Sequence, residues 1–283
     1  MGLIIEKNII EAGAEKEFKI LHITDTHLCF SYESEGEEKV NLAKRRLRNA
    51  FGGEGTPEKY LLEAIEYAKK NDDLIAYTGD IYDYLSQANL DYFKKVLAEM
   101  DYIYAAGNHD YCTYPGRDKE DYDFKMNQIK LIAPYVKYNL MFDSRVINGV
   151  NLVMVENSYY QFTHSQLELL KCEVAKGYPV ILFFHNPIYT KELAEEKMKD
   201  HDCAYVCAPT EELISRYPKE RGEYQRANEE TKEFIDYISS EKKILCLITG
   251  HLHTNHITSL ESGLVQYVTG GTFDGYVREF IIR

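Results

Sequence analysis

Five short apolar runs in this sequence each end in polar residues of the kind that bind metal ions. Each run has the character of a buried strand, and aspartate, asparagine or histidine follows it directly or after one glycine. In an open α/β sheet, ligands bind beyond the carboxyl ends of the strands, so these side chains are expected to meet at one edge. Five of the nine histidines lie at these strand ends. The candidate ligands are Asp25, His27, Asp80, Asn108, His185, His251 and His253, with His109 and Asp110 beside them.

In the first part of the chain, apolar runs alternate with helical patterns. Apolar residues recur at helical spacing after Pro57, and a second helix is expected over about 86–100. Strands that are separated by helices pair in parallel through right-handed crossovers, so we predict an α/β fold. The strands are expected at 3–10, 18–24, 73–78 and 102–106.

The second part of the chain adds antiparallel pairing to this alternation. Asn148-Gly149 stands between two apolar segments, 145–147 and 150–155, and is a strong signal for a two-residue hairpin. Helices are expected over 164–176 and 228–241, each followed by a buried strand. Those strands lie at 179–184 and 244–249, and the tail is expected to form antiparallel strands at 255–260, 264–269 and 276–282.

We predict a single domain over residues 1–283 with two polar interruptions. A long loop is expected at about 31–56, and an irregular, charged insertion at about 188–227. Within the loop, residues 41–51 can form a basic helix, for which a solvated face is the favoured interpretation. The alternative is that this helix folds over the metal ligands and binds a phosphate group. Its basic residues are Lys44, Arg45, Arg46 and Arg48.

Composition excludes several classes of function. The formal net charge of -13 opposes binding to a polyanionic duplex, so general nucleic-acid binding is not expected. No apolar run approaches the ~20 residues of a membrane span, so no membrane partner is expected. The N-terminus has no basic segment followed by an apolar stretch, so we expect a cytoplasmic protein with reduced cysteines. The oligomeric state is not encoded in any of these features.

The spacing of the ligands suits two metal ions. In Asp25-Thr26-His27 and His251-Leu252-His253 the ligands are two residues apart, so an extended backbone would point both to the same side. Two ions about 3.5–4 Å apart need a bridging group, and the carboxylate of Asp80 is the candidate. Histidine and carboxylate ligands suit Mn, Fe, Zn, Co or Ni without discriminating among them. Each motif alone is also compatible with an ordinary turn, and it is the ordered set that is specific.

The ordered set resembles the calcineurin-like metallophosphoesterase superfamily. The matching motifs are Asp25-Thr26-His27, Gly79-Asp80-Ile81-Tyr82-Asp83, Gly107-Asn108-His109-Asp110, His185 and Gly250-His251-Leu252-His253. The resemblance implies a four-layer α/β/β/α sandwich with two mostly mixed sheets and a di-metal site at the strand ends. It also implies a phosphoester hydrolase with two divalent or mixed-valence transition-metal ions and a small phosphorylated substrate.

The resemblance also assigns roles to the residues. One metal would be held by Asp25, His27, Asp80 and His253, and the other by Asp80, Asn108, His185 and His251. His109 would act near the scissile phosphate, with Asp110 as its partner. A hydroxide bridging the metals would attack a phosphodiester, a phosphoanhydride or a phosphomonoester, since metals lower the pKa of bound water to about 7.

One departure from the family pattern bears on the substrate. The protein phosphatases of the family carry Asp-Arg-Gly where this chain has Asp83-Tyr84-Leu85, which argues against that branch. Without that arginine and with an acidic chain, we expect diesters or anhydrides to be cleaved faster than monoesters. Two alternatives remain: a non-catalytic metal-binding scaffold of the same fold, and a metal-dependent amidohydrolase, which should begin with His-x-His instead of Asp-x-His.

Overall fold

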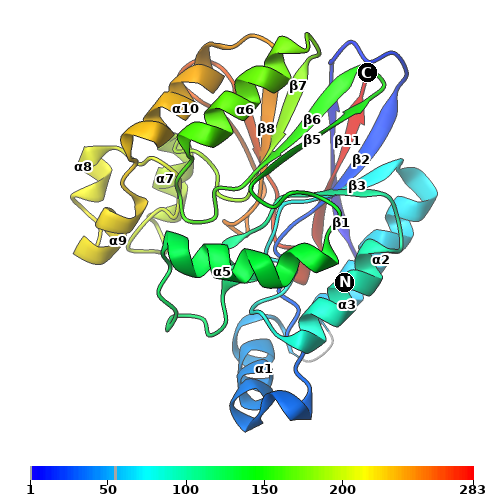
Figure 1. The fold of residues 1–283 in the computed structure, drawn as a ribbon, viewed down its shortest axis with the longest axis vertical. Helices are drawn as coiled ribbons and strands as arrows, with labels where there is room; N and C mark the ends of the chain where they lie inside the picture. The colour runs from blue at the N-terminus through cyan, green and yellow to red at the C-terminus, as the bar shows by residue number, and fades with distance from the viewer. Residues whose placement is uncertain (1, 54–55) are drawn as a thin grey trace.

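Two β-sheets lie face to face in the computed structural model, which describes residues 2–53 and 56–283 (Figure 1). The first sheet has five strands in the order β1-β11-β2-β3-β4, and the second has six in the order β5-β6-β7-β8-β10-β9. The strands are β1 (Ile4–Ile10), β2 (Phe18–Ile23), β3 (Leu74–Tyr77), β4 (Tyr102–Tyr104), β5 (Phe142–Ile147), β6 (Val150–Val155), β7 (Val180–Phe183), β8 (Ile244–Thr249), β9 (His256–Ser259), β10 (Val265–Val268) and β11 (Tyr276–Ile282).

Helices cover the outer face of each sheet, which completes the four predicted layers (Figure 1). Helices α2 (Thr56–Asn71) and α3 (Gln87–Leu97) pack on the first sheet, and α6 (His164–Ala175) and α10 (Glu229–Ser240) pack on the second. Alternate residues of one strand serve different layers: Leu21 of β2 faces the helices, whereas Ile20 faces the other sheet. The core between the sheets also contains Leu152 and Ile181. The predicted sandwich is therefore confirmed.

The last strand does not extend the antiparallel tail as expected. β9 and β10 form the predicted antiparallel pair, but β11 crosses to the first sheet. There it runs parallel to β1 and antiparallel to β2, so it separates the two N-terminal strands. The hairpin prediction is confirmed, because β5 and β6 pair through Asn148 and Gly149 with φ angles of 46° and 80°.

Both polar interruptions contain helices. The segment expected as a loop includes α1 (Glu37–Ala50), which begins earlier than the predicted basic helix. The insertion at 188–227 is not irregular, since it forms α7 (Lys191–Lys197), α8 (Glu211–Ile214) and α9 (Lys219–Gln225). Sequence reasoning also missed α5 (Tyr122–Ile132) and the short α4 (Asn108–Tyr111). Leu193 of α7 and Leu213 of α8 pack against Leu252, so the insertion rests on the loop that carries two candidate ligands.

None of the helices in the described part of the chain is long and apolar enough to cross a bilayer. All six cysteines are free, and Cys172 is the exposed one.

Candidate metal centre

The structure brings the candidate ligands at four of the five strand ends together. Their nitrogen and oxygen atoms form two groups, each with all its members within 4.8 Å of one another, and a third group of this kind joins His27 to Asp83 and His109. The first group is Asp25, His27 and His253, and the second is Asp80, His185 and His251. Asp25 and His27 follow β2, Asp80 follows β3, His185 follows β7, and His251 and His253 follow β8.

The backbone at these ligands is not extended, which corrects the reasoning from spacing. Among the described residues, nine other than glycine have a positive φ, and five of them are candidate ligands. Their φ angles are 50° at Asp25, 52° at His27, 52° at Asp80, 69° at His251 and 51° at His253. Such conformations are costly for residues with side chains and cluster at functional sites. The turns themselves therefore aim these side chains inward.

The glycine before a ligand permits close packing of two strand ends. Gly250 precedes His251, and a Cβ atom at Gly250 would lie 2.5 Å from Oδ2 of Asp25. That oxygen accepts a hydrogen bond from the backbone N–H of His251 at 2.8 Å. The missing side chain therefore lets the loop after β8 dock onto the loop after β2.

The first group converges on one point. Nε2 of His27 lies 3.0 Å from Nε2 of His253, which in turn lies 3.3 Å from Oδ1 of Asp25. Oδ1 of Asp25 is buried and has no hydrogen-bond partner. Two imidazole nitrogens and an unpartnered carboxylate oxygen form a donor set that suits a transition-metal ion.

The second group has the same character. Nε2 of His185 lies 3.3 Å from Oδ2 of Asp80 and 3.1 Å from Nδ1 of His251. The side-chain oxygen of Asn108 is also buried without a hydrogen-bond partner. Oδ2 of Asp80 lies 3.9 Å from Nε2 of His27, so this carboxylate stands between the two groups. The residues present therefore fit two metal ions with Asp80 between them.

Three of the ligand histidines are oriented through their second ring nitrogen. Nδ1 of His185 donates to the carbonyl oxygen of Thr78 at 2.6 Å, and Nδ1 of His27 donates to Oδ1 of Asp83 at 3.1 Å. Nε2 of His251 lies 2.9 Å from the hydroxyl oxygen of Tyr160. Partners of this kind fix the tautomer and orientation of metal-binding imidazoles.

The electrostatics of the pocket favour neutral imidazoles at two positions and an ionised carboxylate. Burial lowers the pKa of His27, and burial holds the pKa of His251 well below its usual value. At His185 burial is outweighed by Asp80, which raises the pKa to about 9. The pKa of Asp80 is held well below its ordinary value, because His185 and His109 outweigh the effect of burial.

The partner of His109 is Asp83, which corrects the expectation that Asp110 orients this ring. Nδ1 of His109 donates to the carbonyl oxygen of Asp83 at 2.8 Å and lies 3.2 Å from its Oδ1. Burial disfavours the imidazolium, but Asp80 and Asp83 outweigh it and raise the pKa of His109 to about 10. The carboxylate of Asp83 also accepts two hydrogen bonds from the guanidinium of Arg46, one from Nε at 2.5 Å and one from Nη2 at 2.8 Å. Despite burial, these neighbours hold the pKa of Asp83 well below its usual range.

Asp110 instead supports the backbone of the site. Its carboxylate accepts hydrogen bonds from the N–H groups of Asp80 (3.0 Å), Ile81 (3.2 Å) and Gly107 (2.8 Å), and from the hydroxyl of Tyr104 (2.8 Å). Burial raises its pKa to about 7. Asp110 therefore fixes the turn that carries Asp80.

A cavity of about 370 Å³ opens beside the second ligand group. Most of its lining was not assigned from the sequence, and it comes from α1, the segment after α4, the region after β6 and the insertion. The only signal for Arg46 was the basic run in α1, and Tyr160 and Arg221 had none. The lining includes Arg46, Asn108, His109, Glu120, Tyr160, Tyr205, Arg221, Tyr224 and His251.

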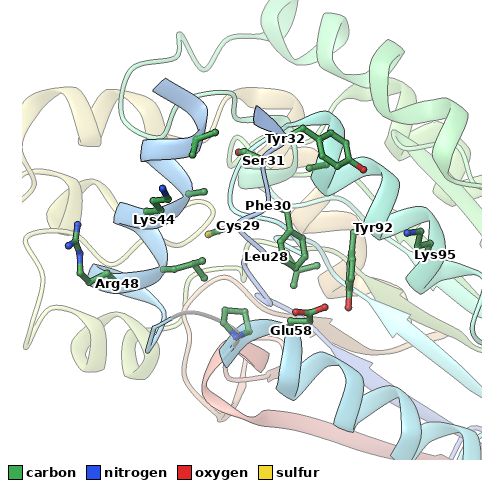
Figure 2. Close-up of a pocket in the computed structure, with 15 residues that line it drawn as sticks. Leu28, Cys29, Phe30, Ser31, Tyr32, Lys44, Arg48, Glu58, Tyr92 and Lys95 are labelled. Carbon is green, nitrogen blue, oxygen red and sulfur yellow. The ribbon is translucent and has the colours of Figure 1, made fainter. Parts of the chain in front are cut away.

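A second cavity, of about 850 Å³, is lined by α1, α2 and α3 (Figure 2). Lys44 and Arg48 of α1 stand on one side of it, and Tyr92 and Lys95 of α3 on the other (Figure 2). None of the candidate ligands lines it. The chemistry of the ligand groups therefore belongs to the smaller cavity.

Comparisons with known proteins agree with this geometry. The model of the calcineurin-like phosphoesterase family matches residues 18–255. A dimetal phosphatase from Danio rerio has 14% identity and a TM-score of 0.53, with 90% of this chain and 88% of that chain covered. No curated protein matches the sequence.

Two further solved structures are similar at a lower level. A protein described as a candidate 5'-nucleotidase from Staphylococcus aureus has 11% identity and a TM-score of 0.48, with 91% of this chain and 49% of that chain covered. Phosphopantetheinyl hydrolase from Mycobacterium tuberculosis has 12% identity and a TM-score of 0.42, with 90% of each chain covered. The family match spans most of the chain and includes every candidate ligand. The chain belongs to the calcineurin-like phosphoesterase family and is thus a metal-dependent hydrolase of phosphoesters.

Proposed function

We propose that this protein hydrolyses a small phosphorylated substrate at a centre of two transition-metal ions. The observation that carries the proposal is the position of Asp80, whose Oδ2 lies 3.3 Å from His185 and 3.9 Å from His27. One carboxylate thereby faces both groups of ligands. The volume of about 370 Å³ lies at the lower end of small-molecule sites and favours a small substrate.

The ligand roles follow from the two groups. Asp25, His27, Asp80 and His253 would hold one ion, and Asp80, Asn108, His185 and His251 the other. Two such ions, when bound, supply a Lewis acid for the phosphoryl oxygens and a nucleophile from water at neutral pH. Side chains that do not bind metal would supply the proton and the further positive charge that the reaction needs.

His109 is the proposed general acid. Its Nδ1 is held by Asp83, and the nearby carboxylates favour its protonated form. Water adds to phosphorus, the bond between phosphorus and the leaving oxygen breaks, and its electron pair stays on that oxygen. The proton of His109 passes to the leaving oxygen, and a proton from the attacking water restores the imidazolium.

Arg46 supplies the guanidinium that the second motif lacks. It reaches Asp83 from α1 and lines the cavity together with Asn108 and His109. A guanidinium at this place helps to hold the dianion of a monoester. One of the two reasons for expecting a preference for diesters is therefore removed, and only the acidity of the chain still supports it.

The test is a panel of phosphoesters assayed with Mn, Fe, Zn, Co and Ni in turn. It includes p-nitrophenyl phosphate and bis-p-nitrophenyl phosphate at the same pH. We expect turnover with at least one metal, and a loss of roughly 10²–10⁴ in kcat for His109→Ala without loss of metal. If wild-type protein with both metals bound hydrolyses none of the panel, the non-catalytic scaffold is the better account.

A further inference from the structure

The cavity at the metal centre has a second guanidinium group in its lining, which the proposed reaction does not use. Arg46 and His109 line the cavity, and so do Arg221 and Tyr205. Arg221 belongs to α9, within the insertion at 188–227, which lies outside all the family motifs found in the sequence. The cavity is therefore bounded by two guanidinium groups from distant parts of the chain.

These two arginines differ in how their charge is compensated. Arg46 makes two hydrogen bonds to the buried carboxylate of Asp83. In residues 2–53 and 56–283, no carboxylate lies within 4.0 Å of the Arg221 guanidinium, although the chain has 46 acidic residues. Glu120 lines the same cavity but forms no ion pair with Arg221 in the described chain. Glu120 acts on Arg221 through space without a direct ion pair, so the N–H groups of this guanidinium can meet an anion in the cavity.

An aromatic ring positions this guanidinium. The central carbon of the Arg221 guanidinium lies 5.7 Å from the centre of the Tyr205 ring, and that ring is 6.4 Å from the ring of His251. A guanidinium over a tyrosine face is held by a cation–π attraction, which leaves its N–H groups available. Two contacts therefore link Arg221 to a candidate metal ligand.

Two tyrosines that line the cavity adopt unusual backbone conformations. Tyr205 has a φ of 52° and Tyr160 a φ of 62°, both in the left-handed region that bulky residues rarely adopt. The hydroxyl of Tyr160 lies 2.9 Å from Nε2 of His251, and its ring packs against Tyr224 at 5.4 Å. Strain of this kind persists where the surrounding structure imposes it, as at binding sites.

We propose that Arg221 and Tyr205 form a subsite for a second anionic group on the substrate. This inference rests on the proposed function, because it assumes that the first phosphoryl group lies at the metal ligands. The substrate class is then a small molecule with two phosphate groups, either joined as an anhydride or carried as two esters. A planar guanidinium pairs with phosphate through two parallel hydrogen bonds, which makes it a suitable partner for the second group.

The test compares two inhibitors that differ only in the second anionic group. Methylenediphosphonate and methylphosphonate compete with p-nitrophenyl phosphate in the metal-loaded enzyme, and calorimetry measures their binding independently of turnover. For Arg221→Ala we expect a loss of about tenfold in affinity for the diphosphonate, as for one charged hydrogen-bonded contact. Affinity for methylphosphonate and kcat for p-nitrophenyl phosphate should stay within about twofold.

Two variants control for general effects of charge. Arg226→Ala removes another arginine of the insertion, which bonds to Glu211 and does not line the cavity, and it should leave both affinities unchanged. Glu120→Gln removes the acidic group of the cavity and should strengthen binding of the diphosphonate. Equal losses for both inhibitors in Arg221→Ala, no loss, or the same loss in Arg226→Ala would overturn the subsite. Absence of turnover in wild-type protein would instead count against the proposed function, while the calorimetric comparison still tests Arg221.

Discussion

At the scale of single residues, Asp83 links three side chains of the site. Its buried carboxylate contacts the candidate ligand His27, the proposed acid His109 and the guanidinium of Arg46. Burying an unpaired carboxylate costs free energy, and these three hydrogen-bonding partners offset that cost for Asp83. Asp83 thus orients the proposed acid His109 and the candidate ligand His27, and it ties α1 to the site.

Of the two aspartates near His109, Asp110 is expected to matter mainly for the stability of the fold. Unlike Asp72, Asp110 accepts backbone N–H groups at both of its oxygens, so the NH2 group of an asparagine would face one of these donors. Asp110→Asn should therefore lower the free energy of unfolding by about 1–3 kcal/mol, although burial raises the pKa of Asp110. Chemical denaturation measures this loss, with the exposed Asp123→Asn as the matched control. An inactive Asp110→Asn protein of unchanged stability would contradict the supporting role given to Asp110.

The clustering of the candidate ligands could be predicted from the sequence because each of them lies in a short motif at the end of an apolar run. The partnership of His109 could not, since Asp83 and Asp110 are both near it and only the folded turns decide between them. The same holds for Tyr160, which meets His251 across 91 residues of sequence. Long-range partners of this kind leave no local pattern.

At the scale of elements, α1 divides its basic residues between two surroundings. The expected solvated face is found for Lys44, Arg45 and Arg48, which are exposed, but not for Arg46. Arg46 lies over the ring of Phe51 at 5.2 Å and bonds to Asp83. The interpretation of the whole stretch as a solvated face was therefore wrong for the one residue that reaches the site.

Two variants separate the contribution of Arg46 at the site from that of the exposed basic residues of α1. Arg46→Ala should raise KM for p-nitrophenyl phosphate about tenfold, because a charged hydrogen-bonding partner of the site is lost. The double change of Lys44 and Arg45 to alanine should leave KM unchanged, because both side chains are exposed and neither lines the cavity at the candidate ligands. Steady-state kinetics decides between them, and an equal effect of both variants would exclude a specific role for Arg46.

The end of α2 carries a destabilising carboxylate. Asp72 follows this helix, and neither of its side-chain oxygens has a hydrogen-bond partner. Burial, with a smaller contribution from Glu279, raises its pKa from 3.8 to about 7. The folded state therefore holds the proton more tightly than the unfolded state, and stability falls as pH rises from about 4 to about 7.

Asp72→Asn should remove the loss of stability that Asp72 causes as pH rises. We expect a gain of about 1 kcal/mol in the free energy of unfolding above pH 7, allowing for solvent screening of a partly exposed group, and no gain below pH 4. Thermal unfolding across this pH range measures it, and Asp236→Asn on the exposed side of α10 is the control. A gain independent of pH would show that the charge of Asp72 is not its source.

The short helices of the insertion show where element prediction fails. Thr190 and Thr210 cap α7 and α8 by accepting from the N–H groups of Leu193 and Leu213, so capping signals were present. The helices are too brief for an apolar period to stand out in a charged segment. They are stabilised by packing on Leu252, which no local pattern reveals.

At the scale of the whole molecule, the last strand of the chain pairs with the first two strands. β11 lies between β1 and β2, with Ile282 beside Ile10 and beside Phe18. The alternation of strands and helices predicted the layers, but not a pairing across more than 250 residues. Because the two sheets share one core, we propose that residues 1–283 fold as a single domain.

The central claim is that one carboxylate serves two metal ions, and metal content tests it most directly. After reconstitution with Mn and removal of free ions, elemental analysis should find close to two ions per wild-type chain, since the two ligand groups meet at Asp80. Asp80→Ala should lose both ions, whereas His109→Ala should keep both. One ion or none in folded wild-type protein, or two ions retained by Asp80→Ala, would contradict the account.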